Sequence, residues 1–362
     1  MTGGEKMEET ERTIGRFFVD EADYEPFRPK VQPEWPPLPL MNDITDEIPE
    51  KFRPYAQWMK KVIDRPDLKI FKTVTRRTPE VCLKVICCRD NEELFRRAVR
   101  ECETAELLRG RPGIVWMLDC DIDPDRKTVS LLEEMERPLN EYLSVEELYP
   151  LTVVHIGTGI LDSLIQIQKA GILYIDVHPG NIYYDEKKVK IGDFGSALKL
   201  CEAEEYNELT GVESFMAPEV WRDRKYSVQS AIYSAGMVLY WILNRCTPPF
   251  LPVRTKQEAF EKRMSGEAFP VPQLIQRFPE EMKDLYRIIQ KMTAFDPAER
   301  YKTFEEARHD LALIGYEFFL EEIEESHKVG FLVGAGDLEQ TVPLFDSFTA
   351  NNRVCDLKDE LS

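Results

Sequence analysis

The chain has 362 residues, of which 43% are hydrophobic, and its formal net charge is −19 at pH 7. This length permits two or three domains with sizeable cores, and the acidic charge argues against nucleic acid or an anionic membrane as a partner. The eight cysteines form no Cys-x-x-Cys pair, and no apolar run reaches the length of about 18 residues that a membrane span needs. With no signal peptide expected, this predicts a cytoplasmic protein with reduced thiols, without a disulfide framework or a zinc site.

Residues 1–54 differ in composition from the rest of the chain. They hold eight of the 24 prolines, and thirteen acidic residues against seven basic ones. Within them, Pro33-Glu-Trp-Pro-Pro-Leu-Pro39 is typical of an extended polyproline-type segment. The segment can serve as a docking peptide for an aromatic groove, as an arm on the protein's own surface, or as a flexible leader. We therefore interpret residues 1–54 as an acidic, proline-rich extension.

From Tyr55 onward the pattern becomes that of strands around one helix. Five runs have the apolar or alternating pattern of strands: 58–63, 68–75, 81–86, 113–119 and 128–133. The first two are joined by Asp64-Arg-Pro-Asp67. Residues 91–108 have helical spacing, with Asp90 or Asn91 as the predicted cap.

The most informative residues follow a long apolar helix predicted at 145–169. Asp176-Val-His-Pro-Gly-Asn181 comes first, then Asp193-Phe-Gly195, then Ala217-Pro-Glu219. Phosphoryl transfer depends on positioning and charge neutralisation more than on covalent chemistry from the protein. Asp176 can accept or orient the proton of an attacking hydroxyl, whereas Asn181 and Asp193 offer the oxygen ligands that Mg²⁺ prefers.

These three motifs, in this order, resemble the eukaryotic-like protein kinase family. The resemblance covers about residues 55–314 and implies an α+β, two-lobed fold, with a small β-rich N-lobe at 55–135 and a larger helical C-lobe at 136–314. Residues 315–362 then form an acidic tail. The resemblance also implies ATP and Mg²⁺ as cofactors, and transfer of a phosphoryl group to a protein hydroxyl, most often that of serine or threonine.

The same resemblance assigns an ion pair in the N-lobe. Lys84 ends Val81-Cys-Leu-Lys84, so it would contact the α- and β-phosphates as a catalytic and cofactor-binding residue. A glutamate of the helix at 91–108 would pair with it. Glu103 is the preferred partner, and Glu101 and Glu106 are alternatives.

The resemblance further implies an adenine pocket and structural contacts. Leu132 would form the back wall of the pocket, and backbone groups of Glu133 and Met135 would bind the adenine edge. Three residues have implied structural roles: Phe194, packed against Tyr174, and the ion pair of Glu219 with Arg300.

The chain departs from the family's pattern at several positions. Asp64-Arg-Pro-Asp67 stands where the family has a glycine-rich loop whose amides cover the phosphates. Ile175 replaces the arginine that clasps a phosphorylated activation segment. His178 replaces a lysine, and it can either act on the transferred phosphate as a catalytic group or hold the loop as a structural histidine. Val212 and Ala231 replace a threonine and a bracing aspartate.

These departures leave alternatives open. A pseudokinase would act as a nucleotide-sensing or scaffolding module without turnover. Small-molecule kinases share an Asp-x4-Asn pattern, but Ala217-Pro-Glu219 with the distant Arg300 favours a protein substrate. The residues at 196–216 include five glutamates, which suit a basic protein substrate, mimic a phosphorylated state or belong to a solvated loop.

Overall fold

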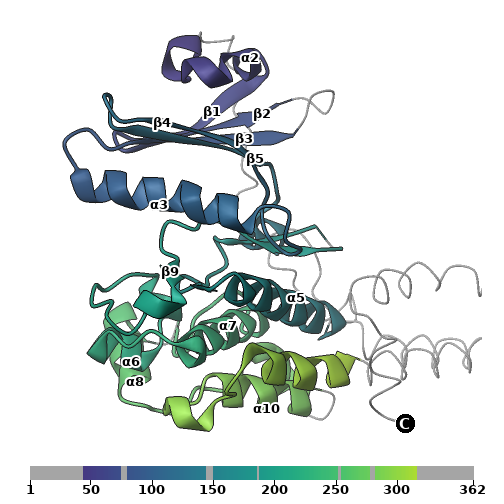
Figure 1. Ribbon diagram of the computed structural model, residues 1–362. Coiled ribbons are helices and arrows are strands. Elements are labelled where there is room, and N and C mark those ends of the chain that lie inside the picture. The colour runs from purple at the N-terminus through teal and green to yellow at the C-terminus, as the bar shows by residue number, and fades with distance from the viewer. Residues whose placement is uncertain are drawn as a thin grey trace, which may run out of the picture.

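The structure is a computed structural model, and it describes residues 44–74, 80–143, 150–185, 187–251, 254–277 and 282–315. It has two lobes, a smaller one built on a β-sheet and a larger one built mainly from helices (Figure 1). This is the α+β, two-lobed arrangement that the sequence predicts. The proline-rich segment 33–39 and nearly all of the tail at 315–362 lie outside the described residues.

The N-lobe is a five-stranded antiparallel sheet in the order β1-β2-β3-β5-β4, with the long helix α3 against one face (Figure 1). Asn91 is the N-cap of α3, because its side chain accepts a hydrogen bond of 2.9 Å from the Leu94 amide. The elements are η1 (Thr45–Glu47), η2 (Glu50–Phe52), α2 (Arg53–Ala56), β1 (Met59–Asp64), β2 (Leu68–Thr73), β3 (Val81–Cys87), α3 (Glu92–Leu108), β4 (Met117–Asp123) and β5 (Thr128–Glu134).

One strand begins later than the sequence predicts. The run at 113–119 was expected to be a single strand, but β4 starts at Met117. The residues before it pair with the other lobe instead: the Val115 amide donates to the Ile191 carbonyl (2.9 Å), and the Ile191 amide donates to the Gly113 carbonyl (2.9 Å). This short stretch therefore joins the two lobes.

The face of the sheet opposite α3 is covered by the segment just before β1. Ile48 and Phe52 are 2% and 1% exposed, and they pack in one cluster with Phe71, Leu83 and Leu132. Apolar residues of this kind contribute to stability in proportion to the area that they remove from water. The boundary predicted between residues 54 and 55 therefore falls inside packed structure, and the N-lobe begins by about residue 44.

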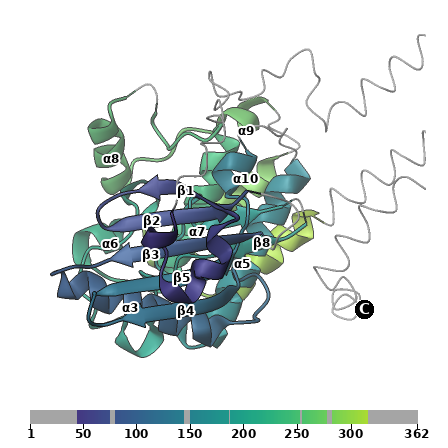
Figure 2. The ribbon, with the colours of Figure 1, turned by 90° about the horizontal axis from the view of Figure 1, so that it is seen from above.

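The C-lobe is organised around two apolar helices, α5 and α7, with α10 packed against α7. A reciprocal capping box between Ser227 and Ser230 starts α7. Seen from above, the sheet lies over α5 and α7, while α8 and α9 extend beyond its β1 edge (Figure 2). The elements are α4 (Leu139–Tyr142), α5 (Pro150–Lys169), β6 (Ile172–Leu173), β7 (Ile182–Tyr184), β8 (Val189–Ile191), β9 (Leu198–Lys199), η3 (Leu200–Glu202), η4 (Glu213–Phe215), α6 (Pro218–Asp223), α7 (Val228–Leu243), α8 (Lys256–Met264), α9 (Gln273–Arg277), α10 (Lys283–Met292) and η5 (Pro297–Glu299).

Among the described residues, α5 is the one helix that is long and apolar enough to cross a membrane by length and composition alone. The sequence predicts no run of that kind, so the structure differs from the prediction here. However, 61% of the apolar stretch is buried inside the protein, which is the position of a core helix. It packs against α7 and β8, and these contacts support the loop that carries Asp176.

Candidate active site

Three of the four predicted catalytic and metal residues of the C-lobe, Asp176, Asn181 and Asp193, lie together. β7 and β8 form a hairpin in which Ile182 pairs with Ile191, so the residues on either side of the hairpin, Asn181 and Gly192, are neighbours. The Gly192 amide donates to the Asn181 carbonyl (3.1 Å), and the Asn181 side-chain amide donates to the Asp176 carbonyl (3.2 Å). Asp193 follows Gly192 directly. The hairpin of β7 and β8 thus brings the side chains of Asp176, Asn181 and Asp193 close together.

Asp176 is held by two groups. Its Oδ1 accepts a hydrogen bond of 3.0 Å from the Val212 amide, and His178 Nε2 lies 3.8 Å away. Burial raises the pKa of the Asp176 carboxyl, and the His178 imidazole and the Val212 amide act against that rise. Val212 replaces the threonine that the resemblance implies, so no side-chain hydroxyl is present at this position. The main-chain amide of Val212 supplies a hydrogen-bond donor to Asp176 instead.

His178 has a defined orientation. Its Nδ1 accepts a hydrogen bond from the Gly180 amide (3.1 Å), so the ring proton is on Nε2, the atom that faces Asp176. A Cβ at Gly180 would meet His178 Cε1 at 2.8 Å, so this close approach needs glycine. The arrangement suits a positioning role for His178 toward Asp176.

The N-lobe lysine pairs with Glu101, and the prediction of Glu103 is wrong. Lys84 Nζ lies 2.6 Å from Glu101 Oε1 and 3.3 Å from Asp193 Oδ2. Burial alone would lower the pKa of Lys84, but the charges of Glu101 and Asp193 outweigh it and raise that pKa. The Lys84 charge in turn outweighs burial at Asp193 and lowers the pKa of its carboxyl.

Helical periodicity explains why Glu101 was the right choice. The buried face of α3 includes Ala98, Glu101, Ala105 and Leu108, which recur at spacings of three and four residues. Glu103 falls between these positions and is exposed. The signal was present in the sequence, because a glutamate on the apolar stripe of a helix is the one that reaches the interior.

Asp193 has an unusual backbone conformation. Its φ is +58°, in the left-handed region that aspartate tolerates better than most residues. Tyr174 supports the turn, because its hydroxyl donates to the Gly192 carbonyl (2.8 Å) and its ring lies edge-on to Phe194, with 5.8 Å between the ring centroids. Phe194 is 1% exposed. The aromatic pair therefore anchors the carboxylate that points at Lys84.

The residue of β5 on the face of Lys84 differs from the predicted one by one position. Cys82 pairs with Glu133 across β3 and β5, and Lys84 pairs with Leu131, so Glu133 projects from the same face as Lys84. Leu132 points to the opposite face and packs outside the cleft, so its assignment to the back wall is wrong. Burial raises the pKa of the Glu133 carboxyl to about 8.

Ion pairs stabilise the connection between the lobes, which includes Glu134 and Glu136. The Met135 amide donates to the Glu80 carbonyl (2.9 Å), so this amide is used within the N-lobe. Binding of the adenine edge by backbone groups of Glu133 and Met135 stays a prediction. Lys190 Nζ lies 2.7 Å from Glu134 Oε1 and also bonds Glu136. Because Lys190 is in β8, this network links the connection to the strand that precedes Asp193. Sequence reasoning missed it.

The turn that replaces the glycine-rich loop is closed on itself. The Arg65 amide donates to the Leu68 carbonyl (2.9 Å), and the Leu68 amide donates back to the Arg65 carbonyl (3.3 Å). Pro66 has no amide to offer. The Asp64 carboxylate lies 2.7 Å from Lys61 Nζ, which offsets part of its charge. Few amides of this turn are therefore free to cover a phosphate.

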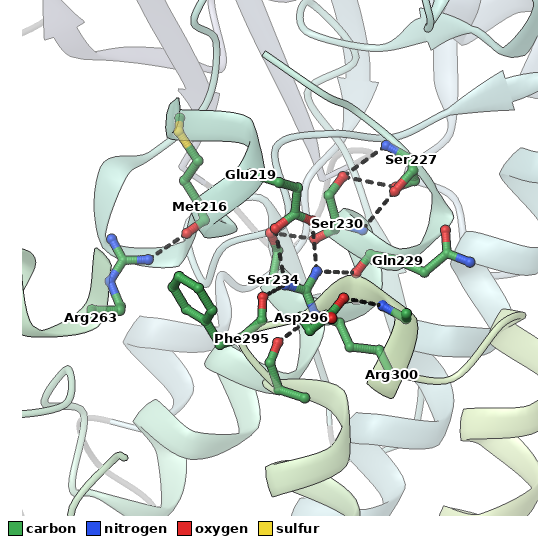
Figure 3. Close-up of polar contacts among 12 residues, drawn as sticks. Met216, Glu219, Ser227, Gln229, Ser230, Ser234, Arg263, Phe295, Asp296 and Arg300 are labelled. Atoms are coloured by element: carbon green, nitrogen blue, oxygen red, sulfur yellow. Dashed lines mark hydrogen bonds and ion pairs between the residues drawn. The ribbon is translucent and has the colours of Figure 1, made fainter. Parts of the chain in front are cut away.

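The segment at 196–216, which corresponds to the activation segment, is followed by an ion pair between Glu219 and Arg300 (Figure 3). Arg300 Nη1 lies 2.7 Å from Glu219 Oε1, and Arg300 Nη2 lies 3.0 Å from Glu219 Oε2. The arginine also donates to the carbonyls of Gln229, Ala294 and Phe295. Both side chains are buried, and the hydrogen bonds to the carboxylate and the three carbonyls replace those that water would make with the guanidinium.

The residues that would hold Mg²⁺ have the right chemistry. The Asn181 side-chain nitrogen is used by the Asp176 carbonyl, which leaves its oxygen available, and Asp193 supplies a carboxylate. No cluster of three His, Cys, Asp or Glu side chains able to hold a metal occurs in the part of the chain that the structure describes. The ion would therefore need phosphate and water oxygens to complete its shell.

Comparison with known proteins agrees with this geometry. The family model for the protein kinase domain matches residues 69–311. A probable serine/threonine-protein kinase of Clostridium perfringens is 27% identical over 230 residues, which are 62% of this chain and 33% of that protein. Calcium-dependent protein kinase 21 of Arabidopsis thaliana is 27% identical over 240 residues, 62% of this chain and 42% of its own length.

The serine/threonine-protein kinase PrkC of Bacillus subtilis is 27% identical over 239 residues, 64% of this chain and 36% of its own. The matched region of this chain therefore spans well under half of each of these relatives. The family model, in contrast, covers more than half of this chain, from the second strand of the N-lobe into the helical residues 304–315. The chain belongs to the protein kinase domain family.

Proposed function

We propose that this chain transfers the γ-phosphate of ATP to a serine or threonine hydroxyl of a protein, in a reaction that depends on Mg²⁺. The observation that carries the proposal is the ion-paired chain of Glu101, Lys84 and Asp193, at 2.6 and 3.3 Å. It spans both lobes and ends beside Asp176 and Asn181. A protein without this chemistry has no need to bring these five side chains together.

Each residue has a role that its surroundings support. Lys84 neutralises phosphate charge and is kept protonated by its two carboxylates. Asp176 orients the substrate hydroxyl and accepts its proton, with His178 and the Val212 amide fixing the carboxylate. Asn181 and Asp193 would hold Mg²⁺, which supplies positive charge to the phosphate oxygens when bound.

The proposed substrate is a basic protein. The segment that leads to Ala217-Pro-Glu219 includes exposed glutamates: Glu202, Glu204, Glu205, Glu208 and Glu213. Carboxylates on this surface raise the local concentration of cationic chains and repel acidic ones.

The seven described cysteines are all free thiols, and we propose the cytoplasm as the location of the protein.

The test compares the wild-type chain with Asp176→Asn, using Mg²⁺, labelled ATP and a basic carrier protein. A general base typically contributes about 10²–10⁴-fold to the rate, so the variant should lose most turnover and keep nucleotide binding. Glu103→Gln is the matched control, because Glu103 is exposed and lies outside the site. Wild-type turnover in Asp176→Asn would show that the catalytic role assigned to Asp176 is wrong.

The second candidate is a pseudokinase that binds nucleotide and does not turn it over. The closed turn at Arg65 and Leu68 favours it, because the amides of these two residues are used within the turn. We expect Mg²⁺-dependent ATP binding in the range of tens to hundreds of micromolar, equivalent to roughly 5–6 kcal/mol. Calorimetry with and without Mg²⁺ measures this. No binding at millimolar ATP would leave the scaffolding function.

A further inference from the structure

One cysteine of the N-lobe sheet lies on the face that α3 covers. Cys120 in β4 pairs with Leu131 in β5, and Leu131 pairs with Lys84 in β3. Residues that pair directly across antiparallel strands project from the same face of a sheet. Lys84 meets Glu101 of α3 at 2.6 Å, so this is the face against which α3 lies (Figure 1). The Cys120 side chain is therefore directed towards α3.

A second cysteine approaches Cys120 from the helix. Cys102 is on the buried face of α3, one position after Glu101, and it is 2% exposed. It belongs to the main core cluster, and Cys120 packs against that same cluster. A side-chain hydrogen bond joins the two thiols. The packing of α3 on the sheet thus brings two sulfur atoms from different elements within reach of each other.

The two thiols differ in their surroundings. Cys120 is half-buried on β4, which is an edge strand of the sheet. Lys51 Nζ donates to the Cys120 carbonyl (2.6 Å) and to Asp119 Oδ1 (2.7 Å), so an ammonium group lies beside this cysteine. Partly exposed thiols next to a lysine are the ones that react with oxidants. Burial raises the pKa of the Cys102 thiol, so Cys102 stays protonated and does not react first.

We propose that Cys120 and Cys102 form a reversible disulfide when the chain meets hydrogen peroxide. The Cys120 sulfur attacks the O–O bond of the peroxide, which leaves a sulfenic acid on Cys120 and releases one water. The Cys102 sulfur then attacks the sulfenic sulfur, so that the S–S bond forms, the S–O bond breaks and a second water leaves. The two thiols lose two electrons and two protons in all, and the peroxide gains them. A dithiol reductant reverses the reaction.

The disulfide fixes α3 to β4 close to the position that the structure describes. The two thiols are already in contact while Glu101 pairs with Lys84, so the bond needs only a small displacement of the helix. Cys102 follows Glu101 directly, so the cross-link restricts the residue that carries the ion pair. Oxidation should therefore preserve this ion pair. An effect on phosphoryl transfer rests on the proposed function, whereas formation of the disulfide does not.

The experiment treats the full chain with an equal molar amount of hydrogen peroxide and blocks the remaining thiols with N-ethylmaleimide. Mass spectrometry of unreduced peptides then maps the disulfides. We expect a cross-linked peptide that joins Cys102 to Cys120, loss of two of the eight thiols, and recovery of both with dithiothreitol. The melting temperature should rise by about 5 °C, because the cross-link constrains the unfolded chain. Amide hydrogen exchange in α3 should slow.

Three variants assign the two sulfur atoms. Cys120→Ser should abolish both the cross-link and the rise in melting temperature. Cys102→Ala should abolish the cross-link and leave a sulfenic acid on Cys120, which dimedone traps. Cys201→Ser is the control, because Cys201 is an exposed free thiol in η3, outside the N-lobe. This variant should keep both the cross-link and the rise.

The absence of a peptide joining Cys102 to Cys120 after peroxide treatment overturns the proposal. A rise in melting temperature that persists in Cys120→Ser also overturns it, as does loss of the cross-link in Cys201→Ser. If circular dichroism shows that Cys102→Ala does not fold, Cys120→Ser and the mapped peptide decide the question, because Cys120 is only half-buried. The mapping needs no ATP, so its outcome is independent of whether the chain is an active kinase.

Discussion

Replacement of Glu101 by glutamine should impair binding of the nucleotide, whereas the same change at Glu103 should not. The Glu101 side chain is 5% exposed, and its Oε1 lies 2.6 Å from Lys84 Nζ. Glu103 is exposed on the same helix. Both substitutions keep the size of the side chain and remove one negative charge, so the two variants differ only in the contact that is lost.

The magnitude follows from what Lys84 retains. A hydrogen bond to a charged group contributes about 1.5–3 kcal/mol. In Glu101→Gln, Lys84 keeps Asp193 at 3.3 Å, and the glutamine oxygen still accepts a hydrogen bond. The loss should therefore lie in the lower half of that range, at about 1.5–2 kcal/mol, which corresponds to roughly a 10- to 30-fold change. Lys84 should then draw Asp193 away from the metal.

Calorimetric titration with ATP and Mg²⁺ measures the affinity, and kcat/KM with a basic protein measures the effect on transfer. A melting curve for each variant checks that α3 remains folded. An equal loss in Glu103→Gln and Glu101→Gln would refute the reasoning, because it would mean that α3 presents a different face to the cleft. Unchanged affinity in both variants would show that the ion pair does not align the nucleotide.

Three further results are expected. Asp193→Ala should remove the Mg²⁺ dependence of ATP binding, measured by calorimetry with and without the metal. Thr210→Ala with Ser214→Ala should change turnover only a few-fold, because the buried apolar Ile175 cannot clasp a phosphate; a large loss restored by an activating kinase would contradict this. Glu219→Ala should lower the free energy of unfolding by about 3–5 kcal/mol, measured with urea, because it leaves a buried arginine unpaired.

The overall fold could be predicted because its signals are local and ordered along the chain. The alternating runs that became β2, β3 and β5 carry the period of two that strands require. The order of the motifs around Asp176, Asp193 and Glu219 then indicates which lobe each residue belongs to. Such patterns need no knowledge of distances, so they survive the step from sequence to structure.

The errors came from choices of face and register, which depend on packing. Glu103 and Glu101 are two residues apart, a rotation of about 200° on a helix, so one reaches the interior and the other reaches water. Leu132 and Glu133 are one residue apart on a strand, which reverses the face. Burial of α3 fixes the first choice, and the pairing of β3 with β5 fixes the second.

Other contacts could not be predicted because they use the main chain. The Val212 amide reaches Asp176 across 36 positions, and any residue type except proline could supply that donor. The bonds from Arg263 to the carbonyls of Met216 and Glu213 could not be predicted for the same reason, because every residue has a carbonyl. A departure from a family pattern at a side chain therefore does not show that the contact itself is lost.

The stability of the chain without nucleotide or Mg²⁺ should fall as the pH rises from about 4.5 to about 8, because of Glu133. Burial raises the pKa of this carboxyl from 4.5 to about 8; the Lys84 charge opposes that rise, and the charges of Glu101 and Asp193 add to it. Between these pH values the folded chain binds a proton that the unfolded chain has released. The free energy of unfolding must therefore decrease with pH in this window. Glu133→Gln removes the titration, so the variant should gain stability relative to wild type as the pH rises. Urea unfolding at pH 5, 6.5 and 8 measures both slopes, and equal slopes would show that Glu133 is ionised in the folded chain.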